Sequence, residues 1–413
     1  MWLATQPPFP QKDPPMYALL LAIIYIAFIS LGLPDSLIGA GWPVMQRDLD
    51  VPIAFMGFVT VIIAGGTIVS SLASERLTRR WGAGLVTAVS VGMTAAAMLG
   101  FASSGSFWML CLWAIPYGLG AGAVDAALNN YVALHFAARH MNWLHACWGL
   151  GASISPFIMS STLSAGMPWN SAYLIVGIIQ AVLTFALFAS LPLWGRNRTT
   201  VPLASGDSSQ ADAPEPAPAH KTPHVPLMTA LRIPGVPYVL TAFFAYCAFE
   251  ATAILWASTY FVTDRGVEPS LAAAFAAMYV LGITVGRFLA GFVADRVGDR
   301  MLIRGGFIMA GVGVVMIALP FGGSAFALVG LVIAGLGSAP IYPAIIHSTP
   351  TNFGRENSQA IIGIQMASAY VGSTLAPPTF GFLAEVTGTW IFPLFLGVLV
   401  VLGLVMSERL ARR

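Results

Sequence analysis

Four ionisable side chains lie inside long apolar runs of this 413-residue sequence: Asp35, Asp125, Glu250 and Arg287. A charge inside an apolar membrane span is costly, so such a residue usually faces a cavity or a partner charge and marks a functional site. A carboxylate that is partly removed from water also takes up a proton more readily near neutral pH. Proton transfer and solute binding are therefore the chemistry to expect of the three acids.

The two aspartates are the predicted proton-coupling residues. Asp35 follows Pro34 in the outer half of the first run, and because proline opens the local backbone, the carboxylate can face a central cavity. The alternative is an aspartate at a helix end that reaches outward water. Asp125 shares a helix face with Asn129, and a carboxylate beside a carboxamide can bind hydroxyl groups or relay a proton. Its alternative is a polar clasp between helices.

The predicted solute-binding residues are polar or aromatic groups within the apolar runs. Glu250 lies near the middle of its run, one turn after Tyr246 and before Trp256. This setting suits a polar solute whose ring faces stack on aromatic side chains, or an organic cation; the alternative is a protonated glutamate that serves only packing. The predicted set is Asn129, His145, Trp148, Glu250, Trp256 and Gln365. We expect Arg287 to reach the membrane interface or to pair structurally.

Composition places the chain among membrane proteins. Hydrophobic residues make up 57% of the sequence and charged residues 9%, against about 25% charged in soluble proteins. The net charge of +2 gives no indication of nucleic-acid binding, and the three cysteines lie in apolar runs, which argues against disulfides and a metal site. There is no nucleotide-binding, zinc or nucleophile motif, so we expect neither an enzyme nor a cofactor.

Long apolar runs in lipid must be helices, because their backbone groups have to hydrogen-bond internally. The sequence therefore predicts an all-α membrane protein in two halves, residues 1–194 and 236–413. Residues 195–235 are rich in proline without apolar periodicity and predict a linker. The twelve predicted spans lie near 16–38, 53–74, 84–103, 107–131, 143–165, 170–193, 237–262, 271–293, 302–320, 324–348, 358–383 and 388–407.

The basic residues predict the orientation in the membrane. Sixteen of the 19 Lys and Arg residues fall on one predicted side, and Arg47 and Arg265 fall on the other. The positive-inside rule then places both termini and the linker in the cytoplasm. The first fifteen residues are polar and proline-rich, and the next run is long enough to span, so we expect no cleavable signal. These features predict a multi-pass protein of the plasma (inner) membrane.

A charged segment at residues 286–300, GRFLAGFVADRVGDR, has a degenerate copy 220 residues earlier. Both copies end one apolar run and precede another, so the repeat predicts two similar six-span halves. The matching charged residues are Glu75, Arg76 and Arg80 in the first copy and Asp295, Arg296 and Arg300 in the second. At a helix end, the carboxylate of Asp295 can accept hydrogen bonds from the free amides of a neighbouring helix. The six residues are candidates for gating, or for a loop that only sets topology.

The second copy resembles the G-x-x-x-D-R-x-G-x-R signature of the major facilitator superfamily, and that resemblance favours gating. It also implies two pseudo-symmetric six-helix halves that rock about a central cavity. Residues 30–43, 118–132, 144–156 and 246–256 are similar to the fucose–proton symporter group and its sugar-transporter relatives. In that group, an aspartate in helix 1 and an acid in helix 4 serve proton coupling and sugar binding. Asp35 and Asp125 stand at those positions, the second as aspartate where the fucose symporter has glutamate.

These patterns predict a secondary active transporter that couples protons to symport of a sugar or related polyol. One alternative is proton-driven efflux of drugs or metabolites. Another is a non-transporting membrane sensor or scaffold on the same fold. The expected partners are a small-molecule substrate and the lipid bilayer, with no nucleic acid, and the expected oligomeric state is a monomer. Protons are the only expected coupling species.

Overall fold

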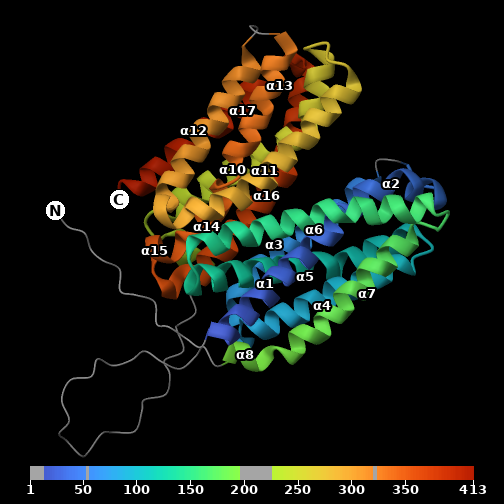
Figure 1. The fold of residues 1–413 in the computed structure, drawn as a ribbon, viewed down its shortest axis with the longest axis vertical. Helices are drawn as coiled ribbons and strands as arrows, with labels where there is room; N and C mark the ends of the chain where they lie inside the picture. The colour runs from blue at the N-terminus through green and yellow to red at the C-terminus, as the bar shows by residue number, and fades with distance from the viewer. Residues whose placement is uncertain (1–13, 53–54, 196–225, 320–322) are drawn as a thin grey trace, which may run out of the picture.

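The computed structural model describes residues 14–52, 55–195, 226–319 and 323–413, and within these ranges the regular structure is entirely helical (Figure 1). The predicted all-α fold is therefore confirmed. Residues 196–225 of the predicted linker lie outside the described residues. The described remainder of the linker contains a short helix, α9 (Leu227–Leu231), rather than extended chain only.

The first half of the chain forms a bundle in which α3 packs on α5, α4 on α5 and α7, and α1 on α6. Its helices are α1 (Pro14–Asp35), α2 (Leu37–Asp48), α3 (Met56–Trp81), α4 (Ala83–Ala102), α5 (Phe107–His135), α6 (Ala138–Ser164), α7 (Asn170–Ala189) and α8 (Leu191–Gly195).

The second half forms a similar bundle, in which α12 packs on α13 and α17, and α10 on α16 and α17. Its helices are α10 (Val236–Thr263), α11 (Pro269–Val297), α12 (Asp299–Ala318), α13 (Gly323–Ser338), α14 (Ile341–His347), α15 (Thr349–Phe353), α16 (Arg355–Thr387) and α17 (Phe392–Ala411), with a short 3-10 turn, η3 (Thr389–Ile391).

Ten described helical stretches are long and apolar enough to cross a membrane, and α6 and α16 complete the twelve predicted spans. These two are long, with 27 and 33 residues, but carry more polar residues. The reason lies in their position, because α6 packs against α11 of the other half and α16 packs against α3 and α5 of the other half. A helix that faces protein and a polar cavity does not need a lipid-compatible surface all round.

Two predicted spans are broken helices. The first predicted span is interrupted at Ser36, between α1 and α2, and the tenth is interrupted at Ala339 and Pro340, between α13 and α14. Pro34 explains the first break, because proline cannot hydrogen-bond the carbonyl four residues before it and its ring crowds that carbonyl. The carbonyl in question belongs to Ser30, and Gln180 of α7 donates to it from 2.8 Å. A neighbouring helix thus satisfies the group that the break leaves free.

The two halves meet at one end and spread apart toward the other (Figure 1). They are close where α14 and α15 approach α5 and α6, whereas α2 and α13 lie on parts of the halves that diverge. The chain ends described for α1 and α17 lie on the side where the halves meet.

Glycines allow the helices within each half to approach closely. A Cβ added to Gly122 of α5 would overlap the carbonyl oxygen of Thr67 in α3, and one added to Gly118 would overlap that of Ile63. Small residues at such crossings permit backbone contact in membrane bundles. The α3–α5 contact holds two cavity-lining helices at a fixed separation.

We predict that Gly122→Ala destabilises the protein by about 1–3 kcal/mol, because the added methyl group must push α3 and α5 apart. The measurement is the thermal unfolding midpoint of detergent-purified protein. Gly65→Ala is the matched control, because a Cβ at Gly65 in α3 meets no atom within 4 Å. A lower midpoint for the first variant alone is expected, and equal midpoints for both variants would contradict the packing account.

Candidate functional site

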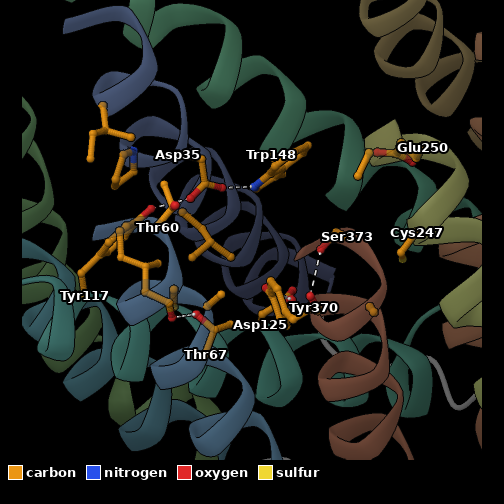
Figure 2. A pocket seen from close by; sticks show the side chains of 18 of the residues that line it. Asp35, Thr60, Thr67, Tyr117, Asp125, Trp148, Cys247, Glu250, Tyr370 and Ser373 are labelled. Atoms are coloured by element: carbon orange, nitrogen blue, oxygen red, sulfur yellow. Dashed lines mark hydrogen bonds between the residues drawn. The ribbon is translucent and has the colours of Figure 1, made fainter. Parts of the chain in front are cut away.

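A cavity of about 420 Å³ lies between the two halves. This volume falls in the range of small-molecule binding sites, about 300–1,000 Å³. Helices α1 to α7 of the first half and α10, α11, α14 and α16 of the second half contribute residues to its lining. Asp35, Trp148, Asp125, Tyr370 and Glu250 surround the space in Figure 2.

Asp35 ends α1, at the break that Pro34 creates, and its carboxylate lines the cavity. The Tyr117 hydroxyl of α5 donates to Oδ1, and the Trp148 indole Nε1 of α6 donates to Oδ2 over 2.8 Å. Each carboxylate oxygen thus has its own donor (Figure 2). Donors aimed at both oxygens stabilise the charged form in a place where water is scarce.

Asp125 links the two halves of the protein. Its side chain is 5% exposed; Asn129 Nδ2 donates to Oδ1 over 2.7 Å, and the Tyr370 hydroxyl of α16 donates to Oδ2 over 3.0 Å. The Asn129 amide oxygen lies 3.0 Å from His145 Nε2. Because this oxygen can only accept, the His145 proton is assigned to Nε2. A hydrogen-bonded chain therefore runs from Tyr370 through Asp125 and Asn129 to His145.

Glu250 and Arg287 form a charge pair on the other wall. Arg287 Nη2 lies 3.4 Å from Glu250 Oε2 and 3.3 Å from the hydroxyl of Tyr246. That hydroxyl also donates to Glu250. Of the two alternatives expected for Arg287, the structure shows pairing and not a position at the membrane interface, because its side chain is 3% exposed, lines the cavity and pairs inside the bundle.

The cavity brings together five of the residues predicted for coupling or binding: Asp35, Asp125, His145, Trp148 and Glu250. The other three do not line it. Asn129 is fully buried behind Asp125, Trp256 Nε1 donates to the Pro377 carbonyl over 3.0 Å, and Gln365 accepts from the Thr349 hydroxyl over 3.0 Å.

The predicted binding and coupling residues did not include Tyr117, Arg287 or Tyr370, and all three line the cavity. Tyr117 lies eight residues before Asp125 on α5, so helical spacing could have placed it on the same face. A charge deep within a span was already the signal for Arg287. Nothing in the sequence separates Tyr370 from other tyrosines in apolar runs.

Asp295 joins the halves at their closed end. It pairs with the Arg139 guanidinium and accepts a hydrogen bond from the Arg139 backbone N over 3.0 Å, at the first turn of α6. A carboxylate at the N-terminus of a helix is favoured by the free amides and the helix dipole. Arg296 lines a small hollow with these two residues.

For Glu75, Arg80 and Arg300, the structure describes contacts within their own half. Glu75 lies 3.6 Å from Arg79 in the same helix, and Arg76 lies beside it on α3. The Arg80 guanidinium lies 5.8 Å from the Trp81 ring. Arg300 lies 4.0 Å from Glu408 of the same half.

Further hydrogen bonds close the same end, and sequence reasoning did not identify them. They join Arg355 Nη2 to the Leu134 carbonyl (2.9 Å), Gln359 Nε2 to Ser74 Oγ (2.9 Å), Ser358 Oγ to Asn130 Oδ1, and His347 Nε2 to the Phe136 carbonyl (3.2 Å). Each crosses from one half to the other. The closed end therefore depends on several links and not on one ion pair.

Comparison with known proteins gives a family match over most of the chain. The family model described as Major Facilitator Superfamily matches residues 24–276 and 238–412. Bypass of stop codon protein 6 of Saccharomyces cerevisiae is 24% identical over 305 residues, which is 70% of this chain and 60% of that protein. The hexuronate transporter of Bacillus subtilis is 23% identical over 393 residues, 90% of this chain and 88% of that transporter.

The fold also matches solved structures. FucP in the outward conformation has a TM-score of 0.76 at 15% identity, with 96% of this chain and 99% of that chain covered. A structure of the E. coli fucose:proton symporter FucP has a TM-score of 0.74 over the same shares. At this identity the likeness concerns the fold.

We predict that Asp295→Asn loosens the closed end, because it removes the charge that Arg139 and the α6 N-terminus stabilise. The opening can be measured with a single cysteine, Ser358→Cys, in a protein whose Cys111, Cys147 and Cys247 are changed to Ala. Ser358 is fully buried at the closed end, so a thiol at this position becomes accessible only when that end opens. This thiol should react several-fold faster with a methanethiosulfonate reagent in the Asp295→Asn protein.

Asp264→Asn is the control for this measurement, because Asp264 bonds Thr263 and Thr389 within one half. The charge-reversed pair Arg139→Asp with Asp295→Arg should slow the thiol reaction again. An unchanged reaction rate in Asp295→Asn would show that the ion pair does not contribute to closure.

Proposed function

Because this chain belongs to the major facilitator superfamily, we propose that it is a proton-coupled symporter of a sugar or a related polyol. The family match over most of the chain and the ten described membrane-spanning stretches identify it as a multi-pass membrane transporter. The coupling ion and the solute are proposals, supported by the cavity. The observation that supports them most directly is the pair of hydrogen-bonded carboxylates, Asp35 and Asp125, on one wall of the cavity.

Asp125 provides a physical route from protonation to movement. When ionised, its carboxylate accepts a strong hydrogen bond from Tyr370 of the other half. Protonation removes the charge and weakens this charge-assisted bond, which links the halves across the cavity. A proton that binds one arrangement of the halves better than the other shifts the equilibrium between them. Proton binding would thereby favour the change of access.

The walls of the cavity support a hydroxylated solute of sugar size. Carboxylates and hydroxyl groups converge on a space that also has aromatic side chains, Trp148 and Tyr342, on its walls. Sugars combine hydroxyl edges with apolar ring faces, so they match this mixture of hydrogen-bonding and stacking groups. The names of two relatives, a hexuronate transporter and a fucose:proton symporter, support the same solute class.

The orientation follows from the basic residues. If the side rich in Lys and Arg is the cytoplasm, the closed end with Arg139, Asp295 and Arg355 faces the cytoplasm. The cavity then belongs to an outward-facing state of a plasma-membrane protein. The fold likeness to FucP in the outward conformation supports this assignment. One chain encloses the cavity, so we propose a monomer with no cofactor besides the transported proton.

Proton-driven efflux of a drug or metabolite is the second candidate, because the same carboxylates would serve an antiporter. An exporter would protect cells from amphipathic toxins and would not accumulate sugars. A non-transporting sensor or scaffold would move no solute and would tolerate the loss of Asp125 and Glu250. Transport assays with a sugar panel therefore separate the three functions.

We predict that Asp35→Asn abolishes accumulation of the solute against its gradient and leaves energy-independent exchange in place. The amide keeps most of the hydrogen-bonding shape but cannot ionise, so the cycle loses its proton-driven step. The measurement compares uptake in energised cells with counterflow in membrane vesicles loaded with unlabelled solute.

Asp48→Asn is the matched control, since Asp48 lies outside the cavity and accepts from Trp169 Nε1 over 2.8 Å. It should accumulate solute as the wild type does. Full accumulation by Asp35→Asn would remove Asp35 from the coupling step. Protection from toxins by wild-type protein that transports none of the sugars would favour the exporter.

A further inference from the structure

Arg287 is the one Lys or Arg side chain among the residues described at the cavity wall. It is 3% exposed and lies in α11, well inside the bundle. Removing a cation from water costs several kcal/mol, so a guanidinium buried here needs good acceptors. Its acceptors in the structure are Glu250 and Tyr246, and both contact only Nη2.

These acceptors leave much of the guanidinium unused. Nε of Arg287 is buried and has no hydrogen-bond partner among the described residues. The 3.4 Å contact with Glu250 is longer than a charge-assisted bond, typically about 2.7–2.9 Å. Arg304 in the same chain shows a matched pair, because its Nε donates to Glu408 Oε1 over 2.6 Å while its Nη2 donates to Oε2. Glu250 does not engage Arg287 in this way.

Aromatic side chains from both halves flank the Arg287 guanidinium. Its Cζ lies 5.9 Å from the Trp148 ring of α6 and 5.8 Å from the Tyr342 ring of α14. Aromatic faces stabilise a cation without using its N–H donors. The donors therefore remain available to an acceptor that enters the cavity between these rings.

We propose that Arg287 binds a carboxylate on the transported solute, so that the substrate is a hydroxylated carboxylate such as a sugar acid and not a neutral sugar. A carboxylate offers two acceptor oxygens in the spacing that the guanidinium fork requires. The hydroxyl groups of the solute then face Asp35 on the opposite wall. This inference rests on the proposed proton-coupled symport and specifies its solute.

Glu250 supplies the charge balance. When the solute carboxylate takes its place at Arg287, Glu250 accepts one proton and becomes neutral, and the Tyr246 hydroxyl stays hydrogen-bonded to it. The site then holds one cation and one anion before and after binding, so the proton on Glu250 offsets the charge of the bound solute. The other titratable groups around this pair are Tyr246 and Cys247 of α10, Tyr279 of α11, Tyr342 of α14 and His145 of α6.

Matched sugars test this inference in proteoliposomes. The probes are radiolabelled galacturonate and glucuronate, compared with galactose and glucose, which differ from them at one carbon. Wild-type protein should exchange an acid and not its neutral partner. The double variant Arg287→Gln/Glu250→Gln replaces both charges of the pair, so no unpaired charge stays buried. This variant should have a KM for the acid that is about thirty-fold higher or more.

Two single variants complete the experiment. Glu250→Gln keeps Arg287 and should retain exchange of the acid while losing the acceleration by low pH. Arg304→Gln removes an arginine that pairs with Glu408 outside the cavity, and it should leave the KM unchanged. Thermal midpoints of all the variants separate loss of binding from loss of folding.

The outcomes separate the two levels of the proposal. One outcome is that the protein exchanges a neutral hexose, that the matching acid does not inhibit this exchange, and that the double Gln variant has an unchanged KM for the hexose. That outcome overturns the anion site but remains consistent with sugar symport. Transport of neither class by wild-type protein overturns sugar symport and the anion site with it. Exchange of an acid that persists in the double variant overturns the role of Arg287.

Discussion

A carboxylate buried between the two halves cannot remain charged without hydrogen-bond donors, and Asp125 receives one donor from each half. Asn129 of its own helix supplies the first and Tyr370 of α16 supplies the second. Burial with 5% exposure makes the charged form dependent on both. The relative position of the halves and the charge on Asp125 are therefore linked. This dependence gives a static bundle a means to respond to protons.

Much of the surrounding structure follows from the need to place polar groups inside an apolar bundle. The polar spans α6 and α16 face the other half, and Gln180 satisfies the carbonyl that Pro34 leaves free. The break after Pro34 in turn ends α1 at Asp35, which places that carboxylate at the cavity between Tyr117 and Trp148. The first half thus carries two acids held by neutral donors. The second half carries a charge pair, Glu250 and Arg287.

The sequence was sufficient for the fold because lipid leaves the backbone few choices. Apolar runs of span length must be helical, and the two breaks were missed because a proline in a span can either be absorbed or interrupt the helix. The acids of the site could also be predicted, since charges in apolar runs are rare. The position of Tyr370 at the cavity could not be predicted, because it depends on Asp125, a partner 245 residues away in the other half. The partner of Arg287 could not be named, because Glu250 lies 37 residues earlier and the pair is visible only once α10 and α11 are packed.

The most direct test of the account is solute-driven proton entry into proteoliposomes that contain the purified protein and a pH-sensitive dye. Adding a transported solute outside should acidify the lumen, and Asp125→Asn protein should show no such change although it still binds the solute. Solute entry into wild-type vesicles without any proton movement would contradict proton coupling through the cavity carboxylates.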